Sequence, residues 1–293
     1  MTPPLIELLV GRDTPPMARE LVTRVSRACM VRASDRALGP AAARVATSAR
    51  APGLAAAMHD RATPLAVVVA RDEDVSSELR DRAELLITDD PARVEQLGPR
   101  ALLAPAHPVD AERHLAIAPF LRERWRRRLR LPSPFTVVSG FPSPTGLRPE
   151  TEATALALAS AAAVRGSTTL VALALGTPVV TDAATAALLG ATDGHDVLVA
   201  SASNAVEVAG GLAADIVEAA RLGREARALV ERRHDVGDVA RTMLTRLGIV
   251  LTPPAVPLGS LQLRLDELHT PFDAPPERRA IAACQALTGA RVA

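Results

Sequence analysis

The sequence predicts an α/β fold built from two parallel-sheet halves that face each other across a cleft. Short apolar runs alternate with longer amphipathic or alanine-rich segments, which is the pattern of parallel strands joined by helices. The apolar runs are hydrophobic at successive positions, as expected for strands covered on both faces. The proline-rich stretch Pro132–Pro134 comes just before a new series of such runs, so the two halves are predicted to meet there.

The individual elements follow from this alternation. The predicted strands are Leu5–Val10, Leu65–Ala70, Glu84–Thr88, Ala101–Ala104, Phe135–Ser139, Thr177–Thr181 and Asp196–Ala200. The segments between them predict helices over Pro15–Cys29, Ala41–Ala49, Pro91–Leu97, Leu121–Leu129, Glu150–Ala161, Thr168–Leu175 and Ala183–Gly190. From Asn204 to Leu247 the pattern predicts two or three helices with a break at Gly223, and a last helix is predicted over Glu277–Leu287.

Composition limits the classes of function. The 293 residues are enough for two small domains or one large one. Hydrophobic residues make up 48% and charged residues 23%, which is typical of a globular protein. The net charge of +1 gives no overall field toward nucleic acid or an anionic membrane surface, so we expect no nucleic-acid partner.

The sequence predicts a cytoplasmic protein. The apolar start, Met1–Gly11, has neither a basic lead nor a cleavage site of small residues, so no secretory signal is expected. The charge-free stretch Gly166–Thr181 contains Gly and Pro and is shorter than the roughly 20 residues of a transmembrane helix. Cys29 and Cys284 are widely separated, and two reduced thiols are expected rather than a disulfide.

In the second half, Gly176–Val180 follows a predicted apolar helix, and Asp193–Val199 contains a glycine turn that leads into a predicted strand. These motifs resemble the Gly-x-Pro-Val-Val segment and the following glycine turn in the donor-binding domain of GT-B glycosyltransferases, both the large retaining group and the spore-protein-like branch. Ala226–His234 and Val239–Leu247 resemble the family's closing helices.

Motifs upstream extend the resemblance to about residues 84–250. Leu86–Asp90 and Pro105–Asp110 look like the end of the family's first domain, Arg122–Pro132 like its basic linker helix, and Phe135–Gly140 like the first strand of its second domain. The resemblance implies a shortened GT-B-like fold of two Rossmann-like domains. It implies an acceptor-side domain over 1–110, a linker helix over 111–134, a donor-side domain over 135–250, and a tail over 251–293 that crosses back to the first domain.

The chain departs from the family at the donor site. The loop Gly140–Gly146 lacks the Arg and Lys with which the family neutralises the donor diphosphate. Ala163 and Val171 stand about where the family has its two glutamates. The chain also passes from Gly146 almost directly to a helix, skipping strands that the family has. These departures leave the catalytic residues unassigned.

The main candidate for phosphate binding is the turn into a predicted helix at Arg165, Gly166, Ser167 and Thr168. A helix N-terminus offers unpaired N–H groups and the positive end of a dipole, and glycine permits a close approach. Arg165 and Arg148 are the cations that would replace the missing pair. The alternative is an ordinary N-cap by Ser167 or Thr168.

Other polar groups are weaker candidates. Gly11 and Arg12 follow the first strand and, with Gly140 and His107, are expected to line the cleft; for Gly11–Asp13 the alternative is a simple turn. The charged runs His59–Arg61 and Asp72–Asp74 are either acceptor contacts or solvated loop charge. Asp193–Asp196 is expected to be a structural turn rather than a metal site, and Arg122–Arg130 a linker helix rather than a nucleic-acid site.

Two functional hypotheses of different class follow. The first is a glycosyltransferase that moves a sugar from a nucleotide-diphosphate donor to an acceptor hydroxyl, with the nucleotide sugar as co-substrate and with no cofactor and no metal. The second is a catalytically inactive relative that keeps the fold as a binding or assembly module. An epimerase or a small-ligand receptor with two Rossmann-like domains is a third alternative. The donor sugar, the acceptor and the oligomeric state stay open, a homo-oligomer included.

Overall fold

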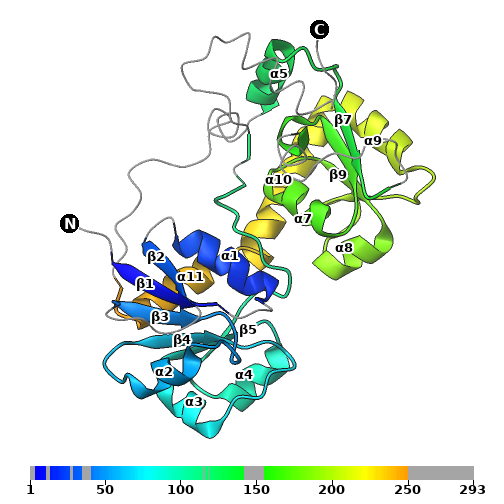
Figure 1. Cartoon of the computed structure of the whole chain (residues 1–293). Coiled ribbons are helices and arrows are strands. Elements are labelled where there is room, and N and C mark those ends of the chain that lie inside the picture. Colours follow the sequence, from blue (N-terminus) through cyan, green and yellow to red (C-terminus); the bar gives the residue numbers. More distant parts are fainter. Residues whose placement is uncertain are drawn as a thin grey trace. The chain divides into compact units, whose positions relative to one another are not determined.

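The computed structural model describes residues 4–10, 14–26, 29–34, 41–114, 116–117, 119–141 and 155–249. They form two compact units (Figure 1). The first unit combines the described residues up to Asp110 with those from His234 onward, and the second contains Ala111–Arg233. Each unit has a parallel sheet with helices packed on it, so the predicted α/β class with two Rossmann-like units is confirmed.

The first unit has a six-stranded parallel sheet in the order β2-β1-β3-β4-β5-β6. Its strands are β1 (Leu5–Leu9), β2 (Met30–Ser34), β3 (Ala43–Ala46), β4 (Leu65–Val68), β5 (Leu85–Thr88) and β6 (Ala101–Leu103). Its helices are α1 (Pro16–Val25), α2 (Leu54–His59), α3 (Ser77–Arg82), α4 (Pro91–Leu97) and α11 (Gly237–Arg246). Because β2 and β3 flank β1, the direction of strand addition reverses beside β1, as in doubly wound folds.

Alternate residues of β1 serve two separate cores. Ile6 and Leu8 pack with residues of α1 and α11, whereas Leu9 packs with residues of α2, α3 and α4. The two helix groups therefore cover opposite faces of the sheet, because successive strand side chains point to opposite sides. Burying a leucine or isoleucine of this kind stabilises the fold by about 1.5–3 kcal/mol.

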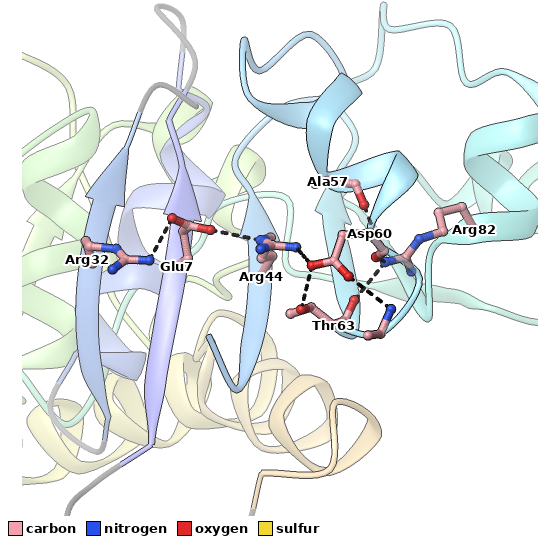
Figure 2. Close-up of polar contacts among 8 residues, drawn as sticks. Glu7, Arg32, Arg44, Ala57, Asp60, Thr63 and Arg82 are labelled. Carbon is pink, nitrogen blue, oxygen red and sulfur yellow. Dashed lines mark hydrogen bonds and ion pairs between the residues drawn. The ribbon is translucent and has the colours of Figure 1, made fainter. Parts of the chain in front are cut away.

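A row of charged residues crosses the first sheet beside its apolar cores (Figure 2). Glu7 of β1 is fully buried and lies in register with Arg32 of β2 and Arg44 of β3. Its carboxylate oxygens accept from Arg32 Nη2 at 2.9 Å and from Arg44 Nε at 2.8 Å. Arg44 also donates to Asp60, which follows α2. The buried charge of Glu7 is thus compensated on both sides, as a carboxylate in a protein interior requires.

The second unit has a four-stranded parallel sheet in the order β10-β9-β8-β7. Its strands are β7 (Thr136–Ser139), β8 (Ala161–Val164), β9 (Val179–Thr181) and β10 (Leu198–Val199). Its helices are α5 (Pro119–Arg128), α7 (Ser167–Ala174), α8 (Ala183–Leu189), α9 (Ala205–Ala214) and α10 (Ile216–Arg233), and residues 155–158 are also helical. No helix among the described residues combines the length and the apolar character needed to span a bilayer.

All seven predicted strands are present, but one predicted helix is wrong. Ala41–Ala49 contains the strand β3 (Ala43–Ala46), which is paired on both sides by β1 and β4. Alanine and arginine favour helix in isolation, and here pairing inside the sheet overrides that weak preference. The strands β2 and β8 and the helices α2 and α3 were not predicted.

Two further predictions in the second unit need correction. The predicted helix Glu150–Ala161 ends earlier, because Ala161 already belongs to β8; its first residues lie outside the described part of the chain. The predicted break at Gly223 is wrong, because Gly223 lies inside the continuous helix α10. A Cβ at Gly223 would stand 2.5 Å from the carbonyl oxygen of Gly176, so this glycine permits close packing rather than a break.

The end of the expected donor-side domain also falls differently. Residues 234–250 were expected in the second domain, whereas α11 packs on α1 in the first unit. The backbone at this return is paired: Val109 N donates to His234 O at 2.9 Å, and Val236 N donates to Val109 O at 3.0 Å. The predicted helix Glu277–Leu287 lies outside the described residues.

Candidate functional site

The candidate site is the turn between β8 and α7, at the carboxyl end of the second sheet. Val164 ends β8, Arg165 and Gly166 form the turn, and Ser167 begins α7. Gly166 has φ 69° and ψ −146°, a backbone conformation that residues with a side chain rarely adopt. A Cβ at Gly166 would have no neighbour within 4 Å, so the backbone conformation, and not a lack of space, favours glycine here.

The first turn of α7 presents backbone N–H groups outward. Gly166 N donates to Thr185 Oγ1 at 3.3 Å, and Thr169 N donates to Gly166 O at 3.1 Å. Ser167 and Thr168 lie between these two residues, and their amides have no acceptor among the described residues. Ser167 is also exposed. Free N–H groups and the positive end of the helix dipole attract an anion at such a position.

Arg165 is the cation beside these amides. Its Nε donates to the carbonyl oxygen of Gly140, just after β7, and its guanidinium carbon lies 5.4 Å from the centre of the Phe141 ring. Gly140 has φ 75°, and a Cβ there would stand 2.9 Å from Arg165 Cγ. The guanidinium group of Arg165 is thus held by two residues, through its Nε and its face, while its terminal nitrogens have no partner among the described residues.

Asp182 is the acidic residue that directly follows a strand at this end of the sheet, and its carboxylate already accepts a hydrogen bond. It follows β9 and caps α8, since Thr185 N donates to Asp182 Oδ1 at 2.7 Å. Thr185 in turn accepts from Gly166 N through its hydroxyl. The carboxylate of Asp182 therefore fixes the N-terminus of α8, and through Thr185 it supports the turn at Gly166.

The structure brings together five of the residues predicted for the donor and cleft sites. Arg165, Gly166, Ser167 and Thr168 form the start of α7, and Gly140 contacts Arg165. Three others, Arg148, Gly11 and Arg12, lie outside the described residues. The ordinary N-cap expected as the alternative is not seen, because the cap residue is Gly166 and no side chain caps the helix.

His107 lies in the first unit, half-buried before Val109. Its carbonyl oxygen lies 3.0 Å from His234 Nδ1, and the centres of the two imidazole rings are 6.5 Å apart. The described contacts of His107 are therefore with His234, where the chain returns to the first unit. That His107 lines a ligand-binding cleft stays a prediction.

The acidic candidates for an acceptor base have structural partners. Asp60 accepts from Arg44 and from Thr63 Oγ1, and the Arg44 hydrogen bond, followed by that of Thr63, holds the pKa of Asp60 well below its usual range (Figure 2). Glu73 is buried and accepts from Ser48 Oγ, from Ala49 N at 3.1 Å and from Ala70 N at 3.0 Å. Both carboxylates therefore organise loops of the first unit.

The segment Asp193–Asp196 is a hydrogen-bonded turn. Asp193 Oδ1 accepts from Val199 N at 2.7 Å, and Asp196 Oδ2 accepts from Thr192 N at 2.9 Å. No group of three His, Cys, Asp or Glu side chains within the described ranges is arranged to hold a metal ion.

The sequence did not single out Phe141 and Thr185, the two side chains that support the site. Phe141 stands in the loop after a predicted strand, and its place beneath Arg165 depends on the pairing of β7 with β8. Thr185 belongs to α8, the helix that follows the neighbouring strand β9. The order of strands in the sheet brings Phe141 and Thr185 close to Arg165 and Gly166, and this order cannot be deduced from the sequence pattern.

Comparison with known proteins gives distant structural similarities only. No protein-family model matches the sequence, and no curated protein matches it significantly. Among solved structures it is similar to HepE of Anabaena in complex with UDP and glucose, at 14% identity over 84% of this chain and 99% of that chain, with a TM-score of 0.48. It is also similar to a glycosyltransferase from Rickettsia africae, at 8% identity over 84% of this chain and 98% of that one, with a TM-score of 0.47.

A third similar structure is WaaG, a glycosyltransferase involved in lipopolysaccharide biosynthesis, at 11% identity over 82% of this chain and 98% of that chain, with a TM-score of 0.42. Two of these three similar structures are described by name as glycosyltransferases. The similarities are distant, and no ligand or activity follows from them.

Proposed function

We propose that this chain is a GT-B glycosyltransferase that binds a nucleotide-diphosphate sugar at the N-terminus of α7 and transfers the sugar to an acceptor hydroxyl. One observation supports the proposal above all: the unpaired amides of Ser167 and Thr168 lie in the first turn of a helix next to Arg165, whose guanidinium group is held by Gly140 and Phe141. A diphosphate is the type of ligand that this combination of donors and positive charge suits.

The same groups would assist the chemical step. In sugar transfer, the bond between the anomeric carbon and the phosphate oxygen breaks, and its electron pair stays on the diphosphate. The acceptor oxygen bonds to the anomeric carbon and loses its proton to water. Negative charge therefore grows on the leaving diphosphate, where preorganised N–H donors and the Arg165 guanidinium stabilise it. This mechanism needs neither a metal nor a cofactor.

A second candidate function is nucleotide binding without catalysis. Ala163 favours it, because this alanine stands about where GT-B glycosyltransferases have a glutamate. Ala163 is completely buried in the centre of β8 and offers no functional group to a sugar. The loop after β7 also lacks the family's two cations. Such a chain would keep the fold as a binding or assembly module.

Binding and turnover separate the two functions. A thermal-shift screen of the purified chain against UDP, GDP and ADP and their glucose conjugates tests for binding, because a ligand of the native state raises the melting temperature. Release of free sugar from a stabilising conjugate would support the transferase, and stabilisation without release would support the binding module. No stabilisation by any nucleotide diphosphate would contradict both. The cytoplasmic location stays a prediction.

A further inference from the structure

The opposite end of α7 is held by two arginines from other helices. Arg122 of α5 donates from Nη2 to the carbonyl oxygens of Leu175 and Gly176, both at 2.8 Å. Arg227 of α10 donates from Nη1 to the carbonyl oxygen of Ala174. The last carbonyl groups of a helix have no partner within the helix and carry its negative dipole end, so guanidinium groups are well suited to them.

Arg122 has an unusual environment for a cation. Its side chain is buried, and no carboxylate among the described residues pairs with it, whereas its neighbour Arg126 pairs with Glu123 at 2.8 Å. Desolvation, and then the charge of Arg126, lower the pKa of Arg122 to about 10, so it is still protonated at neutral pH. Burial of an unpaired charge is costly, and the carbonyl groups of Leu175 and Gly176, the two residues that follow α7, are the main compensation that the described residues provide.

Arg227 connects α7 to the place where the chain enters the second unit. The same Nη1 lies 3.0 Å from the carbonyl oxygen of Ala111 and 2.5 Å from that of His114. Ala111 is the first residue of the second unit, and α10, which carries Arg227, ends at Arg233, the last residue before the chain returns to the first unit. The guanidinium group of Arg227 therefore contacts both α7 and the segment at Ala111 and His114, where the chain enters the unit. Arg227 itself belongs to α10, after which the chain leaves the unit.

We propose that Arg122 and Arg227 are positioning residues that hold α7 by its carbonyl end and link its N-terminal amides to the segments where the chain enters and leaves the second unit. A helix of eight residues is about 12 Å long, so a small tilt at the clamped end displaces the amides at the other end. That these amides bind a diphosphate rests on the proposed function; the clamp itself does not.

Hydrogen exchange in the full-length, ligand-free protein tests the clamp. The amides of Val171–Ala174 report on α7, because each donates to a carbonyl group in the first turns of the helix. Arg122→Met and Arg227→Met are expected to speed exchange at these amides, and Arg227→Met also near His114. Arg126→Met is the matched control, because Arg126 is equally buried on α5 but donates to Leu158 O, outside α7.

Two results would overturn the clamp: unchanged exchange in α7 in both variants, or an equal increase in the Arg126→Met control. If a methionine variant does not fold, Arg122→Lys and Arg227→Lys serve in its place. Lysine keeps the charge but lacks the planar guanidinium group that reaches several carbonyl groups. These variants should therefore also speed exchange in α7 more than the Arg126→Met control does, but by less than the methionine variants.

A second measurement connects the clamp to the site. Calorimetric titration with UDP is expected to give roughly 2- to 30-fold weaker binding for Arg122→Met and an unchanged affinity for Arg126→Met. Equal affinities of all three proteins would overturn the link between the clamp and the amides. If the wild-type chain does not bind UDP or another nucleotide diphosphate, the proposed function fails, while the exchange measurement still decides whether the clamp exists.

Discussion

Gly223 of α10 lies directly against Gly176, the residue two positions after the end of α7. A Cβ at Gly223 would stand 2.5 Å from the carbonyl oxygen of Gly176, which is closer than a side chain can approach a fixed backbone. The absence of a side chain at this one position therefore sets how closely α10 approaches the carbonyl end of α7. The same carbonyl oxygen accepts a hydrogen bond from Arg122.

Alanine at position 223 tests this packing against helix propensity. Gly223→Ala should lower the free energy of unfolding by about 1–3 kcal/mol, because the clash with backbone outweighs the gain of about 1 kcal/mol that alanine brings to a helix. Gly210→Ala is the control, because Gly210 lies within α9 and a Cβ there would have no neighbour within 4 Å. It should stabilise the protein by about 0.5–1 kcal/mol. Urea unfolding measures both, and equal effects of the two substitutions would contradict close packing of Gly223 against Gly176.

Arg165→Ala should weaken binding of a nucleotide diphosphate by about 10- to 100-fold, the equivalent of losing hydrogen bonds from a charged group. Arg165→Lys keeps the charge but loses the stacking on Phe141, and its affinity should be intermediate. Arg224→Ala removes an exposed arginine of α10 and should leave binding unchanged. Calorimetry measures all three, and equal affinities for the Arg165 and Arg224 variants would rule out a role for Arg165.

Gly140→Ala should affect both stability and binding. The positive φ at Gly140 disfavours alanine by about 1–2 kcal/mol, and the new Cβ would displace the stem of Arg165. Gly98 has a φ of 79° in the first unit and no neighbour within 4 Å of a Cβ, so Gly98→Ala should cost similar stability without weakening nucleotide binding. Calorimetry measures nucleotide binding by the two folded variants, and equal affinities would argue against the role of Gly140 in positioning Arg165.

Asp60 should make stability depend on pH in the acid range. Because Arg44 and then Thr63 lower its pKa in the folded state, its stabilising contribution is fully present above the ordinary value of 3.8 and is lost as pH falls through the lowered pKa (Figure 2). Asp60→Asn should therefore be less stable than the wild type at pH 7, and the difference should shrink below about pH 4. Urea unfolding across this range measures it. A difference that stays constant down to pH 2 would show that the Arg44–Asp60 pair does not cause it.

The sequence pattern was sufficient for strands that are apolar throughout. Segments such as Leu65–Ala70 and Glu84–Thr88 carry continuous hydrophobic runs, and the structure has β4 and β5 there. The pattern failed for β8, whose residues are three alanines and a valine, and for β3, which carries Arg44. Both strands lie inside a sheet, where pairing on two sides decides the conformation of residues with little strand preference of their own.

The candidate site was predictable only in part. The glycine turn with Ser167 and Thr168 can be recognised as a helix start, and Arg165 stands beside it in the sequence. The supports of the site come from elsewhere in the chain: Gly140 and Phe141 follow another strand, and Arg122 belongs to a helix whose arginines indicated only a basic linker. Which guanidinium reaches which carbonyl group depends on packing, which a run of arginines does not specify.

A calorimetric titration of the purified wild-type chain with UDP, repeated with GDP and ADP, tests most directly whether the N-terminus of α7 binds a diphosphate. We expect saturable, one-to-one binding of at least one nucleoside diphosphate, and markedly weaker binding of the same nucleotide by Arg165→Ala. Absence of binding by every diphosphate, or equal binding by wild type and Arg165→Ala, would contradict the claim that the N-terminus of α7 and Arg165 together hold the anion.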